Sequence, residues 1–161
     1  MQKFNYFTLF LLLFSATSCG LFNKNKVSES GKYNTKAINT VVKTARSYVG
    51  TPYKFGGMDE DGLDCSGLVN LAFQSARLVL PRVSADMAEV GREVKMREVR
   101  VGDLVFFITN NGTRINHVGI VTERKSAENV QFIHAASSGV KEDNLYSKYY
   151  QNTFVKATRP F

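Results

Sequence analysis

The residues best suited to covalent chemistry are Cys65 and the chain's two histidines, His117 and His134. Cys65 lies between an acid and a hydroxyl in the stretch DCSGLV, residues 64–69. A thiolate is the nucleophilic form of cysteine, and an imidazole beside it can stabilise the ion pair and protonate a leaving amine. A further polar group then fixes the tautomer of that imidazole. These residue types suit covalent catalysis by Cys65, with His117 as its imidazole partner and His134 as the orienting group if their strands are neighbours.

The residues that follow Cys65 indicate how the sulfur would be held. Apolar side chains recur through residues 65–78, which we expect to form a helix with Asp64 as its N-cap. Cys65 then lies in the first turn, where unpaired N–H groups and the helix dipole favour a thiolate. Gly67 would keep that turn thin enough for a substrate to approach the sulfur. We therefore predict that the pKa of Cys65 lies below that of a free cysteine.

Two other interpretations use the same side chains. Cysteine is often buried as a small apolar residue, and the stretch around Cys65 taken alone favours that role. Cys65, His117 and His134 could also ligate zinc. However, none of these three lies close to another in the sequence, and a helix terminus already favours an ionised sulfur. We therefore expect no metal and no other cofactor.

The elements that must position these side chains predict an α+β domain. Residues 36–49 carry apolar side chains at helical spacing, residues 51–64 are a glycine-rich loop, and Ser84 can begin a short helix that reaches Ala88. Strands are expected at 93–96, 104–108, 117–123, 130–135, 139–142 and 154–159. Because closely spaced strands follow the helices, we expect N-terminal helices packed on a mainly antiparallel sheet. Consecutive strands are usually neighbours, which would bring His117 and His134 together.

The first residues are typical of a secretory signal peptide. Lys3 precedes an apolar run at residues 7–14, and small residues follow as far as Ser18. Such a run is too short to cross a bilayer, which takes about 20 residues. Residues 1–18 are therefore expected to be removed on export.

Cys19 resembles the lipid-bearing cysteine of bacterial lipoproteins, because it stands at the expected cleavage boundary. A disulfide between Cys19 and Cys65 is the alternative that an oxidising compartment permits. Polar residues without apolar periodicity follow Cys19, so residues 19–35 are expected to be a lipidated cysteine with a flexible tether. The folded domain is then expected over residues 36–161.

The net charge of the chain is +7, and its basic residues are scattered along the sequence. A nucleic-acid surface would gather them into a stripe or patch, and an exported protein seldom meets nucleic acid. We therefore expect no nucleic-acid partner, and at most a modest attraction to an anionic cell wall.

Residues 37–161 resemble the NlpC family of cell-wall cysteine peptidases. The stretches that carry the resemblance are TPYKFGG, DCSGLV, LPRVSADM, VGDLVFF, NHVGIVT and FIHAASSGV. The resemblance implies a papain-like fold in which a helix presents the cysteine against an antiparallel sheet. It implies peptidoglycan stem peptides as substrates, typically cleaved between γ-D-glutamate and a diamino acid such as meso-diaminopimelate. Cys65 matches the family's nucleophile, His117 its base and His134 its third, orienting residue.

The same resemblance implies further residues that bind the substrate. Tyr53 matches a tyrosine near the cysteine that helps to bind the substrate or the oxyanion. Other positions that match the lining of the substrate groove are Asp64, Ser66, Arg82 and Ser84. The planar fork of Arg82 suits a substrate carboxylate, and an ion pair within the protein is the alternative.

These observations predict a monomeric peptidoglycan hydrolase that is anchored by its lipid to the periplasmic side of the outer membrane. One alternative is a related amidase or acyltransferase that uses the same cysteine and histidine on another bond. Another is a wall-binding lipoprotein with an inert groove. Product masses, or the lack of a product, would distinguish them.

Overall fold

The structure is a computed structural model that describes residues 34–161. The predicted signal peptide, Cys19 and the tether as far as residue 33 lie outside the described residues. None of the helices between residues 34 and 161 combines the length and the apolar character that a membrane span requires.

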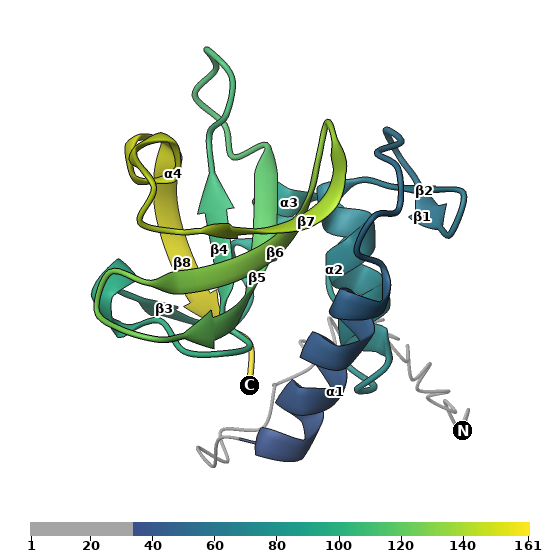
Figure 1. Ribbon diagram of the computed structural model, residues 1–161, viewed down its shortest axis with the longest axis horizontal. Coiled ribbons are helices and arrows are strands. Elements are labelled where there is room, and N and C mark those ends of the chain that lie inside the picture. The colour runs from purple at the N-terminus through teal and green to yellow at the C-terminus, as the bar shows by residue number, and fades with distance from the viewer. Residues whose placement is uncertain (1–33) are drawn as a thin grey trace, which may run out of the picture.

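Along the described chain, three helices and a short two-stranded ladder come before the six strands of the main sheet, and two further short helices lie among those strands (Figure 1). The helical elements are α1 (Thr35–Ser47), α2 (Cys65–Gln74), α3 (Ser84–Met87), the short 3-10 helix η1 (Met96–Glu98) and α4 (Lys148–Thr153). The strands are β1 (Met58–Asp59), β2 (Gly62–Leu63), β3 (Arg92–Val94), β4 (Leu104–Phe107), β5 (His117–Arg124), β6 (Val130–Ala136), β7 (Gly139–Asn144) and β8 (Phe154–Arg159).

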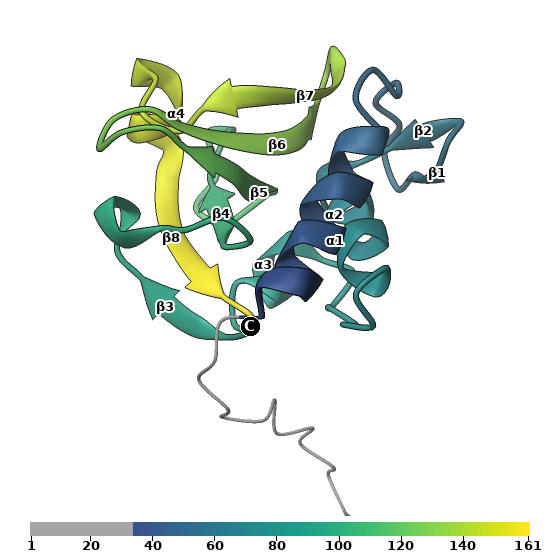
Figure 2. The same cartoon turned by 60° about the horizontal axis from the view of Figure 1, so that its bottom comes forward.

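Six of the strands form one antiparallel sheet in the order β3-β8-β4-β5-β6-β7. The sheet curves strongly, and α1 and α2 lie side by side against one of its faces (Figure 2). The prediction of N-terminal helices on a mainly antiparallel sheet is therefore confirmed. The strands of the two histidines are indeed neighbours, because β5 pairs with β6.

The central strands β4, β5 and β6 contribute to two apolar cores, because their side chains alternate between the two faces. On the helix side, Val118 and Ile120 of β5 pack with residues of α1 and α2, such as Val41 and Leu68. On the other face, Phe107 and Phe132 pack with residues that include Val121, Leu145 and Tyr150. His117 and His134 contact the rings of Phe107 and Phe132, so the two histidines belong to this second face.

The second helix is shorter than predicted, ending at Gln74 rather than at residue 78. Arg77 adopts a left-handed backbone conformation, with φ at 62°. An α-helix cannot continue through such a residue, and the N–H of Leu78 instead bonds back to the carbonyl of Phe73. The apolar pattern continued past the end of the helix because Leu78 still packs on the core.

Three short pieces of secondary structure were not predicted. One is η1, which begins at Met96, where the strand expected over 93–96 gives way after Val94. A ladder between β1 and β2 lies inside the expected loop at residues 51–64. Helix α4, only 6 residues long, precedes β8 and carries Tyr150 into the second core. Elements this short hold too few apolar positions for a repeating pattern, so the sequence gives little sign of them.

Candidate active site

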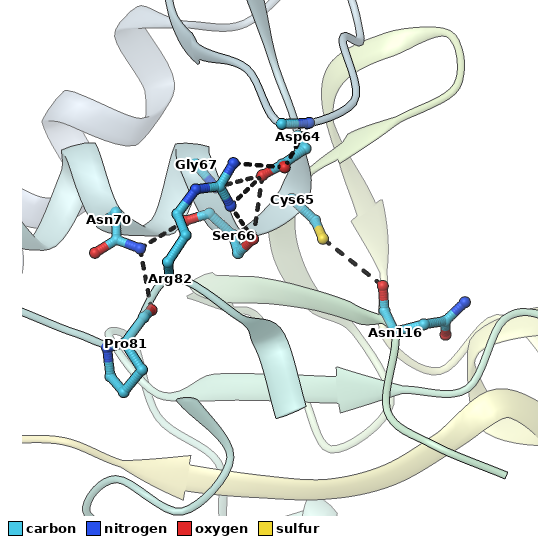
Figure 3. Close-up of polar contacts among 9 residues, drawn as sticks. Asp64, Cys65, Ser66, Gly67, Asn70, Pro81, Arg82 and Asn116 are labelled. Carbon is cyan, nitrogen blue, oxygen red and sulfur yellow. Dashed lines mark hydrogen bonds and ion pairs between the residues drawn. The ribbon is translucent and has the colours of Figure 1, made fainter. Parts of the chain in front are cut away.

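Asp64 caps α2 and collects several donors around its carboxylate (Figure 3). Its Oδ1 accepts hydrogen bonds from the N–H of Gly67 at 2.6 Å and from the hydroxyl of Ser66 at 3.1 Å. Its Oδ2 accepts from the N–H of Gly56 at 3.0 Å. The loop before α2 and the first turn of the helix are thereby tied together, as expected of an N-cap aspartate.

The guanidinium of Arg82 completes this cluster. It donates to Oδ1 of Asp64 at 2.9 Å, to Oδ2 at 2.7 Å and to the hydroxyl of Ser66 at 2.6 Å. Burial alone would raise the pKa of Asp64, but the bonds from Arg82 and Gly67 outweigh it and hold that pKa below its ordinary value. Of the two roles expected for Arg82, its contacts within the chain are those of an ion pair with Asp64.

The sulfur of Cys65 points away from this cluster toward β5 (Figure 3). The thiol lies 3.9 Å from the carbonyl oxygen of Asn116 and also receives a backbone hydrogen bond from Val118. The pairing of β5 with β6 begins at Ile120. The sulfur therefore lies near the start of β5, before β6 pairs with that strand. Cys65 is buried, with 8% of its surface exposed, and forms no disulfide within residues 34–161.

Burial sets the protonation of both partners in the resting site. It raises the pKa of Cys65, the charge of Asp64 adds to this, and backbone hydrogen bonds from Val118 and Ser66 lower it only in part. Burial, together with the neighbouring His134, lowers the pKa of His117 to about 3. The resting pair is therefore a neutral thiol and a neutral imidazole. The predicted depressed pKa of Cys65 is wrong, because desolvation outweighs the helix terminus.

The two histidines form a hydrogen-bonded pair. Nε2 of His117 lies 2.9 Å from Nδ1 of His134, and the two rings are nearly perpendicular at 88°. His134 is almost fully buried and stacks on Phe132, with 4.8 Å between the ring centroids. Its far nitrogen, Nε2, lies 3.0 Å from Oδ2 of Asp143 and 3.1 Å from the hydroxyl of Tyr150. The carboxylate of Asp143 and the phenol of Tyr150 therefore hold His134 on the side away from His117.

Cys65 lies where two cavities meet. The larger, of about 700 Å³, is lined by Cys65, His117 and His134. The smaller cavity, of about 430 Å³, is lined by the predicted groove residues Asp64, Ser66, Arg82 and Ser84. Tyr53, Cys65 and Asn116 line both. The eight predicted catalytic and substrate-binding residues are therefore gathered along one cleft.

Tyr53 lies beside the cysteine, as the resemblance implied. Its backbone bridges to Leu63, which brings it to the start of α2, and its side chain is partly exposed to the cleft. Burial raises the pKa of Tyr53, and the nearby Cys65 and Asp64 raise it further. The phenol therefore keeps its proton at neutral pH and can donate a hydrogen bond into the cleft.

The sequence analysis missed several residues of the cleft, among them Asn116, Lys141, Asp143 and Tyr150. Asn116 lies within NHVGIVT and directly precedes His117, so its place was detectable. Asp143 and Lys141 stand two residues apart on β7, a spacing that puts them on the same face of the strand. In the sequence they read only as charges within a weak strand pattern.

No group of three or more His, Cys, Asp or Glu side chains in residues 34–161 is arranged to hold a metal ion. Two of the three side chains considered as zinc ligands, His117 and His134, direct ring nitrogens at each other.

The fold and this cleft together define a papain-like α+β domain. Residues 50–159 match the NlpC/P60 family, and the chain belongs to that family. A protein of Escherichia coli K12 called "Probable endopeptidase NlpC" is 41% identical over 116 residues, which make up 71% of this chain and 72% of that protein.

Two further relatives span the same region. "Gamma-DL-glutamyl hydrolase" of Bacillus subtilis 168 is 36% identical over 123 residues, or 75% of this chain and 29% of that protein. A solved structure from Staphylococcus aureus Mu50, described as similar to lipoprotein of the NLP/P60 family, has a TM-score of 0.70 and 32% identity. That match covers 82% of this chain and 44% of the solved one. The chain therefore spans less than half the length of these two proteins.

Proposed function

We propose that this protein is a peptidoglycan hydrolase, a cysteine endopeptidase that cleaves stem peptides at the bond between γ-D-glutamate and a diamino acid such as meso-diaminopimelate. The observation that carries the proposal is the position of Cys65, at the junction of two cavities and next to the histidine pair. A stem peptide could lie across both cavities with its scissile carbonyl at the sulfur. Two relatives whose names refer to endopeptidase and γ-DL-glutamyl hydrolase activity support the choice of bond.

The first half of the reaction forms an acyl-enzyme. The Cys65 sulfur bonds to the γ-glutamyl carbonyl carbon as its proton moves to Nδ1 of His117, because Nε2 of that ring is engaged by His134. Since both groups are neutral at rest, the proton moves during the attack rather than before it. His117 then returns this proton to the amine nitrogen of the diamino acid as the carbon–nitrogen bond breaks.

The second half is hydrolysis of the thioester. Water replaces the departed amine, and its oxygen attacks the acyl carbon while Nδ1 of His117 takes a proton from it. The carbon–sulfur bond breaks, and the proton returns to the sulfur, which restores the neutral thiol. The net result is one amide bond hydrolysed by one water molecule.

The first turn of α2 offers the donors that the tetrahedral intermediate needs. Cys65 is the first residue of α2, where a backbone N–H has no acceptor within the helix, so this N–H can donate to the oxyanion. The phenol of Tyr53, which lines both cavities, is a second donor. Each such donor contributes about 3–4 kcal/mol to acyl transfer. Asp64, Ser66, Arg82 and Ser84 form the wall against which the γ-glutamyl side of the substrate would lie.

Digestion of purified muropeptides, read by mass spectrometry, tests the proposal. The wild-type protein should release fragments cut at the γ-D-glutamyl bond, and Cys65→Ala should lower the rate by about 10⁴-fold or more. Cys19→Ser is the matched control, because it removes the chain's only other cysteine and should cleave at the wild-type rate in solution. Products cut at another bond would indicate the amidase or acyltransferase alternative. Binding of muropeptides without any product would indicate the inert wall-binding protein.

We also propose that the mature protein begins at a lipid-bearing Cys19 and is held at the periplasmic side of the outer membrane. The short apolar run, the small residues and the cysteine at their boundary support this arrangement. The intact mass of the protein from membranes should show the lipid at residue 19. Cys19→Ser should lose the lipid and move to the soluble fraction, and an unmodified Cys19 in the membrane fraction would contradict the proposal.

A further inference from the structure

Asp143 of β7 lies behind the histidine pair, outside the residues that would touch the reacting atoms. We propose that Asp143 is a positioning residue for the reaction, because its bond to His134 fixes the tautomers of both histidines and leaves Nδ1 of His117 free to take the thiol proton. This inference rests on the proposed function, in which His117 is the base. It follows from a series of hydrogen bonds of about the same length, which connects the side chains of His117, His134, Asp143 and Tyr150 in that order.

The bond between Asp143 and His134 fixes the first tautomer. An ionised carboxylate only accepts hydrogen bonds, so Nε2 of His134, 3.0 Å from Oδ2 of Asp143, must carry a proton. The hydroxyl of Tyr150 donates to the same Oδ2 at 2.9 Å, so its oxygen can only accept from Nε2. With a lone pair at Nε2 instead, the carboxylate would face that lone pair without a bond. The site therefore favours the Nε2–H form of His134.

The second tautomer follows from the first. A neutral imidazole with a proton at Nε2 has only a lone pair at Nδ1. Nδ1 of His134 lies 2.9 Å from Nε2 of His117, so the latter must donate the proton of this bond. His117 is then protonated at Nε2 and bare at Nδ1. That is the form that a general base needs. A proton on Nδ1 instead of Nε2 of His134 would remove it.

The surroundings keep this arrangement in place. The titratable and charged groups around His134 are His117 from β5, Lys141 and Asp143 from β7, and Tyr150 from α4. Burial would raise the pKa of Asp143, but bonds from Lys141, His134 and Tyr150 outweigh it and keep that carboxyl ionised. Burial lowers the pKa of His134 despite its carboxylate partner, so the ring is neutral at pH 7.

Asp143→Ala tests the proposal by removing the acceptor. The hydroxyl of Tyr150 then has no carboxylate to donate to and can donate to Nε2 of His134 instead, which favours a proton at Nδ1. His117 would then accept at Nε2 and carry its proton at Nδ1, where the thiol proton must go. We expect kcat on muropeptides to fall by about 10²-fold with KM nearly unchanged. Loss of the group bonded directly to a catalytic imidazole costs up to about 10⁴-fold, and loss of a group bonded to that group costs about 10–100-fold. Tyr150→Phe keeps the ring and the carboxylate and should cost less than tenfold.

The tautomers can be read directly by nitrogen-15 NMR, because the chain has only two histidines and therefore four ring nitrogens. The full chain, in detergent and without a histidine tag, should show protons at Nε2 of both rings at pH 7.5. In Asp143→Ala both protons should move to Nδ1. Glu142→Ala is the matched control: it makes the same kind of change one residue earlier on β7, at a side chain that bonds to Arg46 instead. It should alter neither the spectrum nor kcat.

The two kinds of measurement separate the failure of this inference from that of the proposed function. A wild-type spectrum with a proton at Nδ1 of His117 would overturn the inference, and this result needs neither substrate nor any folded variant. Unchanged tautomers and kcat in a folded Asp143→Ala protein would overturn it as well. Correct tautomers in a protein that cleaves no muropeptide would instead reject the proposed function and leave the proton arrangement standing.

Discussion

Arg82 holds both carboxylate oxygens of Asp64, with nitrogen–oxygen distances of 2.9 and 2.7 Å. The pair joins the segment before α3 to the first turn of the helix that carries Cys65. Asn70 strengthens the same junction, because its amide donates to the carbonyl of Pro81 at 3.1 Å. The wall of the smaller cavity and the first turn of α2, which carries Cys65, are therefore connected by these hydrogen bonds.

Arg82→Ala should destabilise the protein, because it leaves the nearly buried carboxylate of Asp64 without its cationic partner. Gly56, Ser66 and Gly67 still donate to Asp64, and the Arg82 side chain is 37% exposed, so we expect a loss of only about 1–2 kcal/mol in the free energy of unfolding. Urea denaturation measures this change. Arg97→Ala is the control, because its side chain is 75% exposed, and it should stay within about 0.5 kcal/mol of wild type.

The alternative role of Arg82, as the partner of a substrate carboxylate, gives a different result. Arg82→Ala would then raise KM for muropeptides while the urea midpoint stayed at the wild-type value. That pattern would contradict the ion-pair interpretation.

Gly67→Ala should damage the active site although alanine is the better helix former. A Cβ at Gly67 would meet the backbone carbonyl oxygen of Gly57, and it would lie 3.1 Å from Oδ1 of Asp64. Alanine in place of glycine gains about 1 kcal/mol in helix propensity, but displacement of the loop against the first turn of α2 costs more. We expect a lower melting temperature and at least a tenfold loss of kcat/KM.

Gly112→Ala is the matched control for this substitution. Its added Cβ would come within 3.0 Å of only an exposed asparagine side chain, that of Asn110, which can move aside. It should leave the melting temperature and kcat/KM close to wild type. Equal effects of the two substitutions would show that the contact of Gly67 with the loop is unimportant.

Local sequence signals predicted the parts of the site that depend on neighbours along the chain. Asp64 is the N-cap of the helix that begins at Cys65, as the order of residue types indicated. His117 and His134 begin or lie within adjacent strands, because consecutive strands tend to pair. The family resemblance contributed the groove residues, which no local pattern would have identified.

The electrostatics of the site could not be predicted in the same way. The sequence places Cys65 at a helix terminus, but it does not show how completely the sheet would bury the sulfur, and burial decides the direction of its pKa. Asp143 and Tyr150 reach His134 only through the pairing of β6 with β7 and the placement of α4. Both depend on contacts between elements rather than on residue order.

The buried histidines should make the protein less stable as the pH falls below neutral. His117 has a pKa of about 3 in the folded protein and an ordinary value of 6.5, and burial lowers the pKa of His134 as well. Between pH 6.5 and about 3 the unfolded chain therefore binds protons at these rings that the folded chain does not. The stability is fully present above pH 6.5 and is lost as the pH falls, with a slope of about 1.4 kcal/mol per pH unit for each proton.

The free energy of unfolding in urea, measured from about pH 7.5 to 5, should follow this slope. His117→Gln removes one of the two rings and should reduce the slope by about one proton, whereas the same slope in both proteins would contradict the assignment. The carboxylates Asp64 and Asp143 have an ordinary pKa of 3.8, lowered further by folding, so they titrate below the measured range of about pH 7.5 to 5 and do not affect the comparison.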